Sequence, residues 1–202
     1  MGSEMNRNSP QLHTRRTATI AIAFVLFAAG FLLLRRQFVS PANVQARPSL
    51  QLTSTSFASG AAIPPKYTCD GADVSPSLAW SAVPATAKSF ALVLHDPDAS
   101  VDFTHWIAYD IPASVHDLGE GASNDGAMPQ GSSEGVNDFR RLGYGGPCPP
   151  PGNPHHYTFL LYALNTDLNL HAGATREQLD SAMQGHIVAQ GQLVGLYQRG
   201  GE

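Results

Sequence analysis

The chain is poor in charge and lacks several short motifs that mark common kinds of site. Only 14% of its 202 residues are Asp, Glu, Lys or Arg. No GK[ST] follows the glycines of residues 143–146, and the flanks do not show strand then helix, which excludes a P-loop nucleotide site there. Asp96, His105 and His155 are of the residue types that bind zinc, but no CxxC or HxxxH spacing is present to support a zinc centre. There is also no internal repeat, which excludes a repeat array.

Basic side chains are scarce beyond residue 47. Six of the 12 Lys and Arg residues lie in residues 1–47, together with one of the 16 acidic residues. From residue 48 onward the chain therefore carries 6 basic and 15 acidic side chains, a formal charge of −9. Such a surface argues against nucleic acid as a partner and against electrostatic docking on anionic lipid. Any anion must be held by local groups.

Long apolar runs are also rare, and one stands out. Residues 17–34 form an 18-residue uncharged run behind Arg15 and Arg16, which is about long enough to cross a bilayer. We expect an uncleaved signal anchor with a cytoplasmic tail at 1–16 and a linker at 35–49. The alternative is a signal peptide cleaved near Ala46. Either way the rest of the chain, residues 50–202, lies outside the cytoplasm, in the periplasm or at the cell surface.

Residues 50–202 are expected to form one loop-rich β domain, since the chain has 19 Gly and 15 Pro and enough length for one core. A first polar cluster follows the apolar run 90–94. Asp96-Pro97-Asp98 ends that predicted strand, because proline cannot donate to a ladder. His105 stands where the next apolar run begins, at residues 105–109.

A second polar cluster lies about 50 residues later. A Gly/Pro loop over residues 143–154 leads into residues 155–164, whose aromatic and aliphatic content predicts a strand. A period of two places His155, Tyr157 and Phe159 on one face and turns His156 the other way. Two polar clusters at strand ends predict one shared pocket.

These motifs, in this order, resemble those of the phosphatidylethanolamine-binding proteins, in particular the bacterial Raf kinase inhibitor-like branch. The resemblance covers roughly residues 50–199. It is carried by Tyr67-Thr-Cys-Asp-Gly71, Ser75-Pro76-x-Leu78-x-Trp80, Asp96-Pro-Asp-Ala99, His105-Trp106, Gly143-x-Gly-Gly-Pro-x-Pro-Pro150 and His155-x-Tyr157.

The resemblance implies a mostly β fold of two packed antiparallel sheets with a few short peripheral helices. It also implies a pocket for a small phosphate- or carboxylate-bearing anion, such as a phospholipid headgroup, with no cofactor. The expected ligand-binding residues are Asp96, His105, Gly145, Gly146, His155 and Tyr157. The expected supporting residues are Pro97, Asp98, Trp106 and His156.

The chemistry of these residue types suits anion capture. Asp96 would orient and charge an imidazole, and His105 and His155 would donate to the anion. Tyr157 would add its hydroxyl, and Gly145 and Gly146 would permit close backbone approach. We therefore expect anion affinity to rise as pH falls from about 7 to 6.

Two positions depart from the family pattern. Ser100 stands where a proline often follows the Asp-Pro-Asp-Ala run. His156 stands where the family usually carries arginine, so a titrating group replaces a permanent cation. Asp98 is expected to brace the loop, against His156.

The two cysteines lie in loops that the family motifs place near the pocket. An exported domain favours a Cys69–Cys148 disulfide, which would close a loop of about 80 residues. Two partly buried free thiols are the alternative.

Two other functions are compatible with the sequence. A hydrolase could use Asp96 and His105 with Ser75 or Ser100, although those serines lie in ordinary turn settings. A protein inhibitor, directed at a protease or another target, is implied by the family's naming. A polyproline ligand at residues 147–154 is a weaker possibility for an exported domain.

The C-terminal part is expected to be scaffold. Thr175-Arg-Glu-Gln178 has the pattern of a capping box that opens a short helix, with Gly185 near its end. Residues 186–197 then predict a closing strand with an irregularity at Gly191. Residues 114–141 have little periodicity and predict a long surface excursion.

Overall fold

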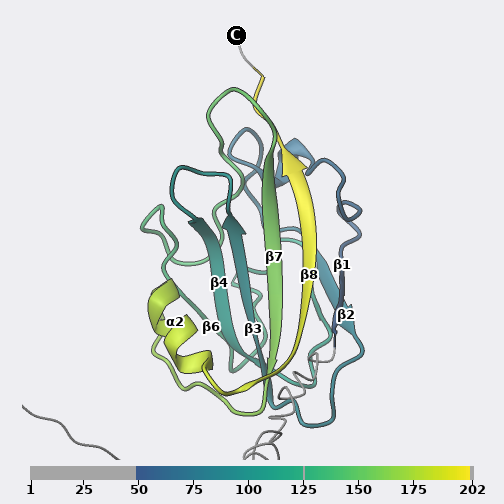
Figure 1. Ribbon diagram of the computed structural model, residues 1–202, viewed down its shortest axis with the longest axis vertical. Coiled ribbons are helices and arrows are strands. Elements are labelled where there is room, and N and C mark those ends of the chain that lie inside the picture. Colours follow the sequence, from purple (N-terminus) through teal and green to yellow (C-terminus); the bar gives the residue numbers. More distant parts are fainter. Residues whose placement is uncertain (1–48, 125, 201–202) are drawn as a thin grey trace, which may run out of the picture. The chain divides into compact units, whose positions relative to one another are not determined.

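The described part of the chain is built on two antiparallel β-sheets. The computed structural model describes residues 49–124 and 126–200. The elements are β1 Gln51–Thr53, η1 (a 3-10 helix) Pro65–Tyr67, β2 Leu78–Ser81, β3 Ser89–Asp96, β4 Phe103–Pro112, β5 Asp117–Leu118, β6 Ser133–Glu134, β7 His155–Leu164, α2 Arg176–Met183 and β8 Ile187–Tyr197. The larger sheet has the order β6-β4-β3-β7-β8 and the smaller one the order β1-β2-β5 (Figure 1). The mostly β, two-sheet prediction is confirmed.

Strand β3 is the centre of the larger sheet. It is buried on both faces for nearly its whole length, which explains why its sequence is a continuous apolar run rather than an alternating one. It pairs with β4 through Asp96 opposite Phe103 and with β7 through His95 opposite Thr158. The polar end of β3 therefore lies beside the first residues of both neighbouring strands.

The two faces of the larger sheet bury different apolar clusters. One face packs against the smaller sheet, with Trp80 of β2 edge-on to Phe90 of β3 at 5.3 Å between ring centroids. The other face, through residues such as Val93 and Ile107, packs with Leu179 of α2. Figure 1 shows α2 beside β4 and β6, where it covers this second face.

Helix α2 begins and ends as its sequence predicts. The Thr175 side chain accepts from the Gln178 amide, the Gln178 side chain accepts from the Thr175 amide, and both halves of the capping box are formed. Leu179 and Met183 are buried, and Gly185 follows the helix end with φ of 80°. This is the one α-helix in the described residues, accompanied by the short η1.

The irregularity predicted at Gly191 is wrong. Gly191 is in regular register opposite Leu161, and the β7–β8 pairing shifts instead between Ala163 and Leu164. A Cβ at Gly191 would meet the backbone of Leu50. Glycine is therefore needed there because another chain segment crosses closely, which is the alternative reason for a glycine inside a strand.

The predictions for residues 1–48, namely the tail, the apolar anchor and most of the linker, lie outside the described residues. Ser49 already belongs to the β structure, since it forms a parallel bridge with Gln190. Among residues 49–124 and 126–200 no helix has both the length and the apolarity needed to cross a membrane.

Candidate functional site

A cavity of about 360 Å³ opens where the polar end of β3 meets the starts of β4 and β7. It is lined by Asp96, Asp98, Ala99, Ser100, Phe103, His105, Phe139, Cys148, Pro149, Pro150, His155 and Tyr157. A larger hollow of about 560 Å³ lies between residues 170–174 and α2. We assign the site to the smaller cavity, because it gathers two imidazoles, a buried carboxylate and a tyrosine from separate strands.

Asp96 is a buried residue of the cavity that is held by three hydrogen bonds. It is 3% exposed, and its Oδ1 accepts the amides of Asp98 at 2.9 Å and Ala99 at 3.2 Å. Its Oδ2 accepts from His155 Nδ1 at 2.7 Å. These bonds satisfy the buried carboxylate, fold the chain back after β3 and hold an imidazole from β7 in place.

The bond to Asp96 also decides which nitrogen of His155 reaches the cavity. A carboxylate only accepts, so Nδ1 carries a proton and Nε2 is left as the ring nitrogen that can meet a ligand. The side chain is 15% exposed. As predicted, His155 and Tyr157 share a face of β7, and His156 turns outward.

His105 reaches the cavity through a β-bulge. Leu94 pairs with Trp106 and the next residue, His95, pairs with Thr104, so His105 is an extra residue with no partner on β3. A bulge re-aims a side chain out of the usual alternation. The result is that the His105 ring lies 5.2 Å from the Tyr157 ring, edge to face.

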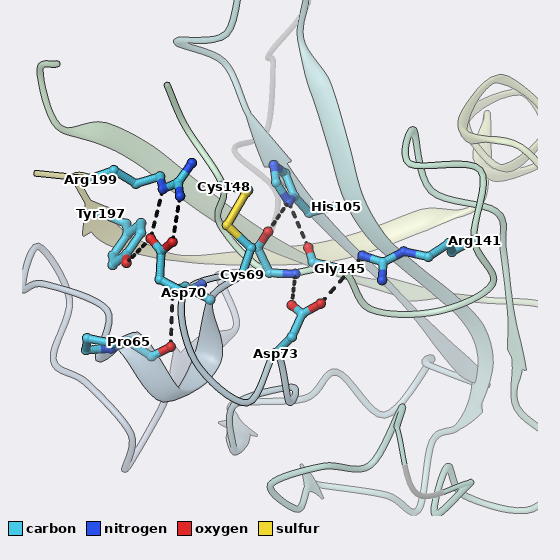
Figure 2. Close-up of a disulfide and its surroundings, with 12 residues drawn as sticks. Pro65, Cys69, Asp70, Asp73, His105, Arg141, Gly145, Cys148, Tyr197 and Arg199 are labelled. Carbon is cyan, nitrogen blue, oxygen red and sulfur yellow. Dashed lines mark hydrogen bonds and ion pairs between the residues drawn. A yellow bond between two sulfur atoms is a disulfide. The ribbon is translucent and has the colours of Figure 1, made fainter. Parts of the chain in front are cut away.

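Two backbone carbonyls hold the ring of His105 from behind. Its Nδ1 is 2.8 Å from Gly145 O and 3.1 Å from Gly146 O, and Figure 2 shows its other nitrogen on the far side of the ring. Burial lowers the pKa of His105, against the opposing pull of the Gly145 carbonyl and the Asp96 charge. The ring is therefore neutral at pH 7.

Gly145 and Gly146 were expected to let a ligand approach the backbone closely, but they do not line the cavity and their amides are engaged within the protein, which corrects that prediction. The Gly145 amide donates to His105 O at 2.9 Å, and the Gly146 amide donates to Asp73 Oδ1 at 2.6 Å. A Cβ at Gly146 would meet Tyr67 O and Asp73. The glycines are needed for close packing behind His105, and their carbonyls orient its ring.

Aromatic rings enclose His105 on the sides that are not polar. Phe103 lies 5.0 Å and Phe139 lies 5.3 Å from it, centroid to centroid. Phe139 belongs to the predicted excursion over residues 114–141, so its place in the cavity was missed. Nothing in the aperiodic sequence around Phe139 indicates that it returns to the site.

The hydroxyl of Tyr157 is buried and unpaired. The residue is 0% exposed, and its OH makes no hydrogen bond in the structure, although Asp96 and Cys148 lie near it. Burial, followed by the charge of Asp96, raises the pKa of Tyr157, so the group keeps its proton. A buried hydroxyl without a partner is costly, and Tyr157 is one of the residues that line the cavity.

The supporting residues divide into rim and core. Asp98 Oδ2 accepts from both the amide and the Nδ1 of His156, each at 2.7 Å, so Asp98 does brace the loop as predicted. Pro97 is an exposed turn residue. Trp106 instead packs in the core, where its indole donates to Glu134 at 2.7 Å, and it does not line the cavity.

The disulfide between Cys69 and Cys148 is present, with Cα atoms 5.4 Å apart. Cys148 lines the cavity, so the bond ties the proline-rich rim to the segment after η1. Figure 2 shows an aspartate on each side of the disulfide, and each aspartate has two hydrogen-bonding partners. Asp70 accepts from Tyr197 and Arg199, and Asp73 accepts from Gly146 and Arg141. Neither set of contacts was predicted from the sequence.

The geometry also bears on two other chemistries, hydrolysis and metal binding. Residues 131–135 match the spacing G-x-S-x-G, a match the sequence analysis overlooked, but Ser133 lies in the edge strand β6 rather than at a strand-to-helix turn. That placement does not form a nucleophile elbow. Within the described residues, no group of three or more His, Cys, Asp and Glu side chains is arranged to hold a metal ion.

Comparison with known proteins shows the family. A family model described as phosphatidylethanolamine-binding protein matches residues 53–198. The chain belongs to that family, and its resemblance in motif order is confirmed.

Individual relatives each match about three quarters of the chain. A UPF0098 protein of Methanothermobacter thermautotrophicus is 47% identical over 152 residues, covering 75% of this chain and all of the relative. A UPF0098 protein of Pyrococcus abyssi is 49% identical over 150 residues, covering 72% and 84%. The crystal structure of E. coli YbcL, titled a new member of the mammalian PEBP family, has a TM-score of 0.71 at 34% identity, covering 75% of this chain and 99% of that one.

Proposed function

We propose that the cavity binds a small anion that presents phosphate or carboxylate oxygens. The observation that carries the proposal is that Tyr157, whose buried hydroxyl makes no hydrogen bond, packs beside two imidazoles whose Nδ1 atoms are already engaged. A ligand oxygen would accept from Tyr157 and meet the Nε2 edges of His105 and His155. The family's descriptive name supports a ligand of this kind.

The side chains that line the cavity provide no permanent positive charge to attract an anion. No Lys or Arg is among the residues that line the cavity, whereas Asp96 and Asp98 are. Attraction for an anion must then come from hydrogen-bond donors among the side chains that line the cavity.

Binding fits the geometry better than turnover. In the described part of the chain no serine is hydrogen-bonded to His105 or His155, whose Nδ1 atoms face carbonyls and Asp96 respectively. Ser100 lines the cavity but is exposed. A nucleophile would need such an imidazole contact for activation. A hydrolase and a protein inhibitor stay predictions of the sequence.

The proposed location is outside the cytoplasm, with the apolar run of residues 17–34 as an anchor. The Cys69–Cys148 disulfide supports this location, because such bonds persist mainly in oxidising compartments.

Calorimetric titration of the protein with inorganic phosphate and with acetate tests the binding proposal. Tyr157→Phe should weaken phosphate affinity by about 10-fold, the value of one hydrogen bond to a charged group. Tyr162→Phe is a matched control, because Tyr162 is on the same strand but packs with the cluster around α2. Absence of any saturable heat with either anion would contradict the proposal.

A further inference from the structure

An anion that approaches the cavity meets a surface of its own sign. Residues 48–202 carry 6 basic and 15 acidic side chains, a formal charge of −9, and the cavity lining contains Asp96 and Asp98 but no Lys or Arg. Hydrogen-bond donors in the lining act only at contact distance, whereas the repulsion reaches about 10 Å at 0.1 M salt. A cation near the mouth of the cavity would offset this repulsion.

Most of the basic side chains are already paired with carboxylates. Four of the six in residues 48–202 contact an Asp or Glu, namely Lys66, Arg141, Arg176 and Arg199. The other two, Lys88 and Arg140, are exposed and form no ion pair with any residue in the described ranges. Lys88 precedes β3, at the end of that strand away from the cavity. Arg140 directly follows Phe139, which lines the cavity.

The turn that carries Arg140 is fixed at the mouth of the cavity. The Arg140 amide donates to Asn137 O at 2.8 Å, which closes the turn. The Asp138 amide donates to Thr104 O at 2.9 Å, and Asp138 Oδ2 accepts from the Thr104 amide at 2.6 Å, so the turn is tied to the start of β4. The backbone of Arg140 is thereby held beside the lining residue Phe139, while its side chain remains in solvent.

The backbone of Arg140 is in the left-handed region, with φ of 61°. A residue with a Cβ is strained there and glycine is not. Elsewhere the chain places glycine in such turns, as at Gly143 and Gly185. An arginine that keeps this strain, at the edge of a cavity without a cation, points to a use for its side chain.

From these observations we propose that Arg140 attracts anions to the cavity from its mouth. Its guanidinium supplies the permanent positive charge that the lining lacks and offsets the field of Asp98 and Asp138. Arg141 is less available, because it faces Asp73 at 3.5 Å and lies over the Phe139 ring at 5.2 Å. This inference rests on the proposed anion binding and adds to it a residue outside the lining.

Calorimetric titration of the protein with inorganic phosphate at two salt concentrations tests the role of Arg140. Arg140→Gln should weaken phosphate affinity about 3-fold at about 0.05 M salt, the effect of one charge acting through solvent. The loss should vanish at about 1 M salt, where the Debye length is about 3 Å. Arg140→Lys should keep the affinity, because it keeps the charge.

Lys88→Gln is the matched control. It removes the same charge from the other exposed cation without an acidic partner among the described residues, at the far end of β3. Phosphate affinity should stay the same in this variant at both salt concentrations. Equal losses in Lys88→Gln and Arg140→Gln would show that only net charge matters, and would overturn the inference.

Arg140→Gly separates the charge from the structure of the turn. Glycine relieves the left-handed backbone, so the melting temperature should not fall, while phosphate affinity should fall as it does in Arg140→Gln. A lowered melting temperature in Arg140→Gly would show that the side chain supports the turn, and would overturn the inference.

The remaining outcomes separate this inference from the proposed function. Unchanged affinity in Arg140→Gln at about 0.05 M salt, or a loss that persists at about 1 M salt, would overturn the role of Arg140 and leave anion binding standing. Absence of saturable heat with phosphate in the unaltered protein at both salt concentrations would overturn the proposed function as well.

Discussion

The two ends of the larger sheet are held together in different ways. Figure 1 shows the end of β3 and the start of β7 at one end, and α2 near the other. At the cavity end the links join residues that are remote in sequence, such as Cys69–Cys148, separated by 79 residues, and Asp96–His155, separated by 59. At the α2 end the cap bonds span three residues, and apolar packing holds the helix to the sheet.

This difference indicates how function and stability are divided. The α2 end is a local element that docks through buried Leu and Met side chains and carries no group aimed at the cavity. The cavity end is assembled from β3, β4, β7, the proline-rich loop and the segment after η1, and polar links set its shape. Substitutions at the α2 end should therefore lower stability alone, whereas substitutions at the cavity end should also lower binding.

The largest effect is expected from removing the disulfide. Replacing both cysteines, Cys69→Ser with Cys148→Ser, should lower the free energy of unfolding by about 4 kcal/mol, because the bond closes a long loop in the unfolded chain. Anion affinity should also fall, since Cys148 lines the cavity. Urea unfolding and calorimetry measure the two effects. Unchanged affinity in a folded double variant would show that the rim keeps its shape without the bond.

A substitution at the other end should affect stability alone. Leu179→Ala removes a fully buried side chain and should cost about 3 kcal/mol through lost burial and the cavity left behind. Phosphate affinity should be unchanged at a temperature where the variant is folded. A parallel loss of affinity would contradict the separation of the two ends.

The smallest effect is expected at the rim. The amide of His156, and then its ring, lowers the pKa of Asp98 below its ordinary 3.8. The stabilisation is therefore present above that value and is lost as pH falls through the lowered pKa. Asp98→Asn should lower the free energy of unfolding at pH 7 by less than about 1 kcal/mol, since the pair is half-exposed. The difference from the unaltered protein should shrink as pH falls below 3.8 and through the lowered pKa.

Asp117→Asn serves as the matched control for that measurement, because Asp117 is an exposed aspartate in the small sheet. A loss of stability as large for Asp117→Asn as for Asp98→Asn would show that the effect comes from net charge and not from the bonds to His156.

Sequence patterns that act locally predicted their structures well. The capping box at Thr175 forms α2 because its bonds join residues three apart. The apolar run ending in Asp96 and the alternating run from His155 became neighbouring strands, which brought both polar ends together. The disulfide was also anticipated, from the family motifs and the expected compartment.

Features that depend on tertiary placement were not predictable. The bulge that turns His105 into the cavity appears only in the register between β3 and β4. The use of the Gly145 and Gly146 carbonyls in place of their amides depends on how the loop crosses behind that ring. Phe139 arrives from an aperiodic segment, where no spacing signals which side chain returns to the site.

The central claim is that an anion binds at the Nε2 edges of His105 and His155, whose Nδ1 atoms are held by backbone carbonyls and by Asp96. Nitrogen-15 spectra of the two imidazoles, recorded with and without phosphate, test it most directly. The account predicts a neutral His105 ring protonated at Nδ1 at pH 7, with its Nε2 resonance shifted by phosphate together with that of His155. A His105 ring protonated at Nε2, or resonances of both rings unmoved by saturating phosphate, would contradict it.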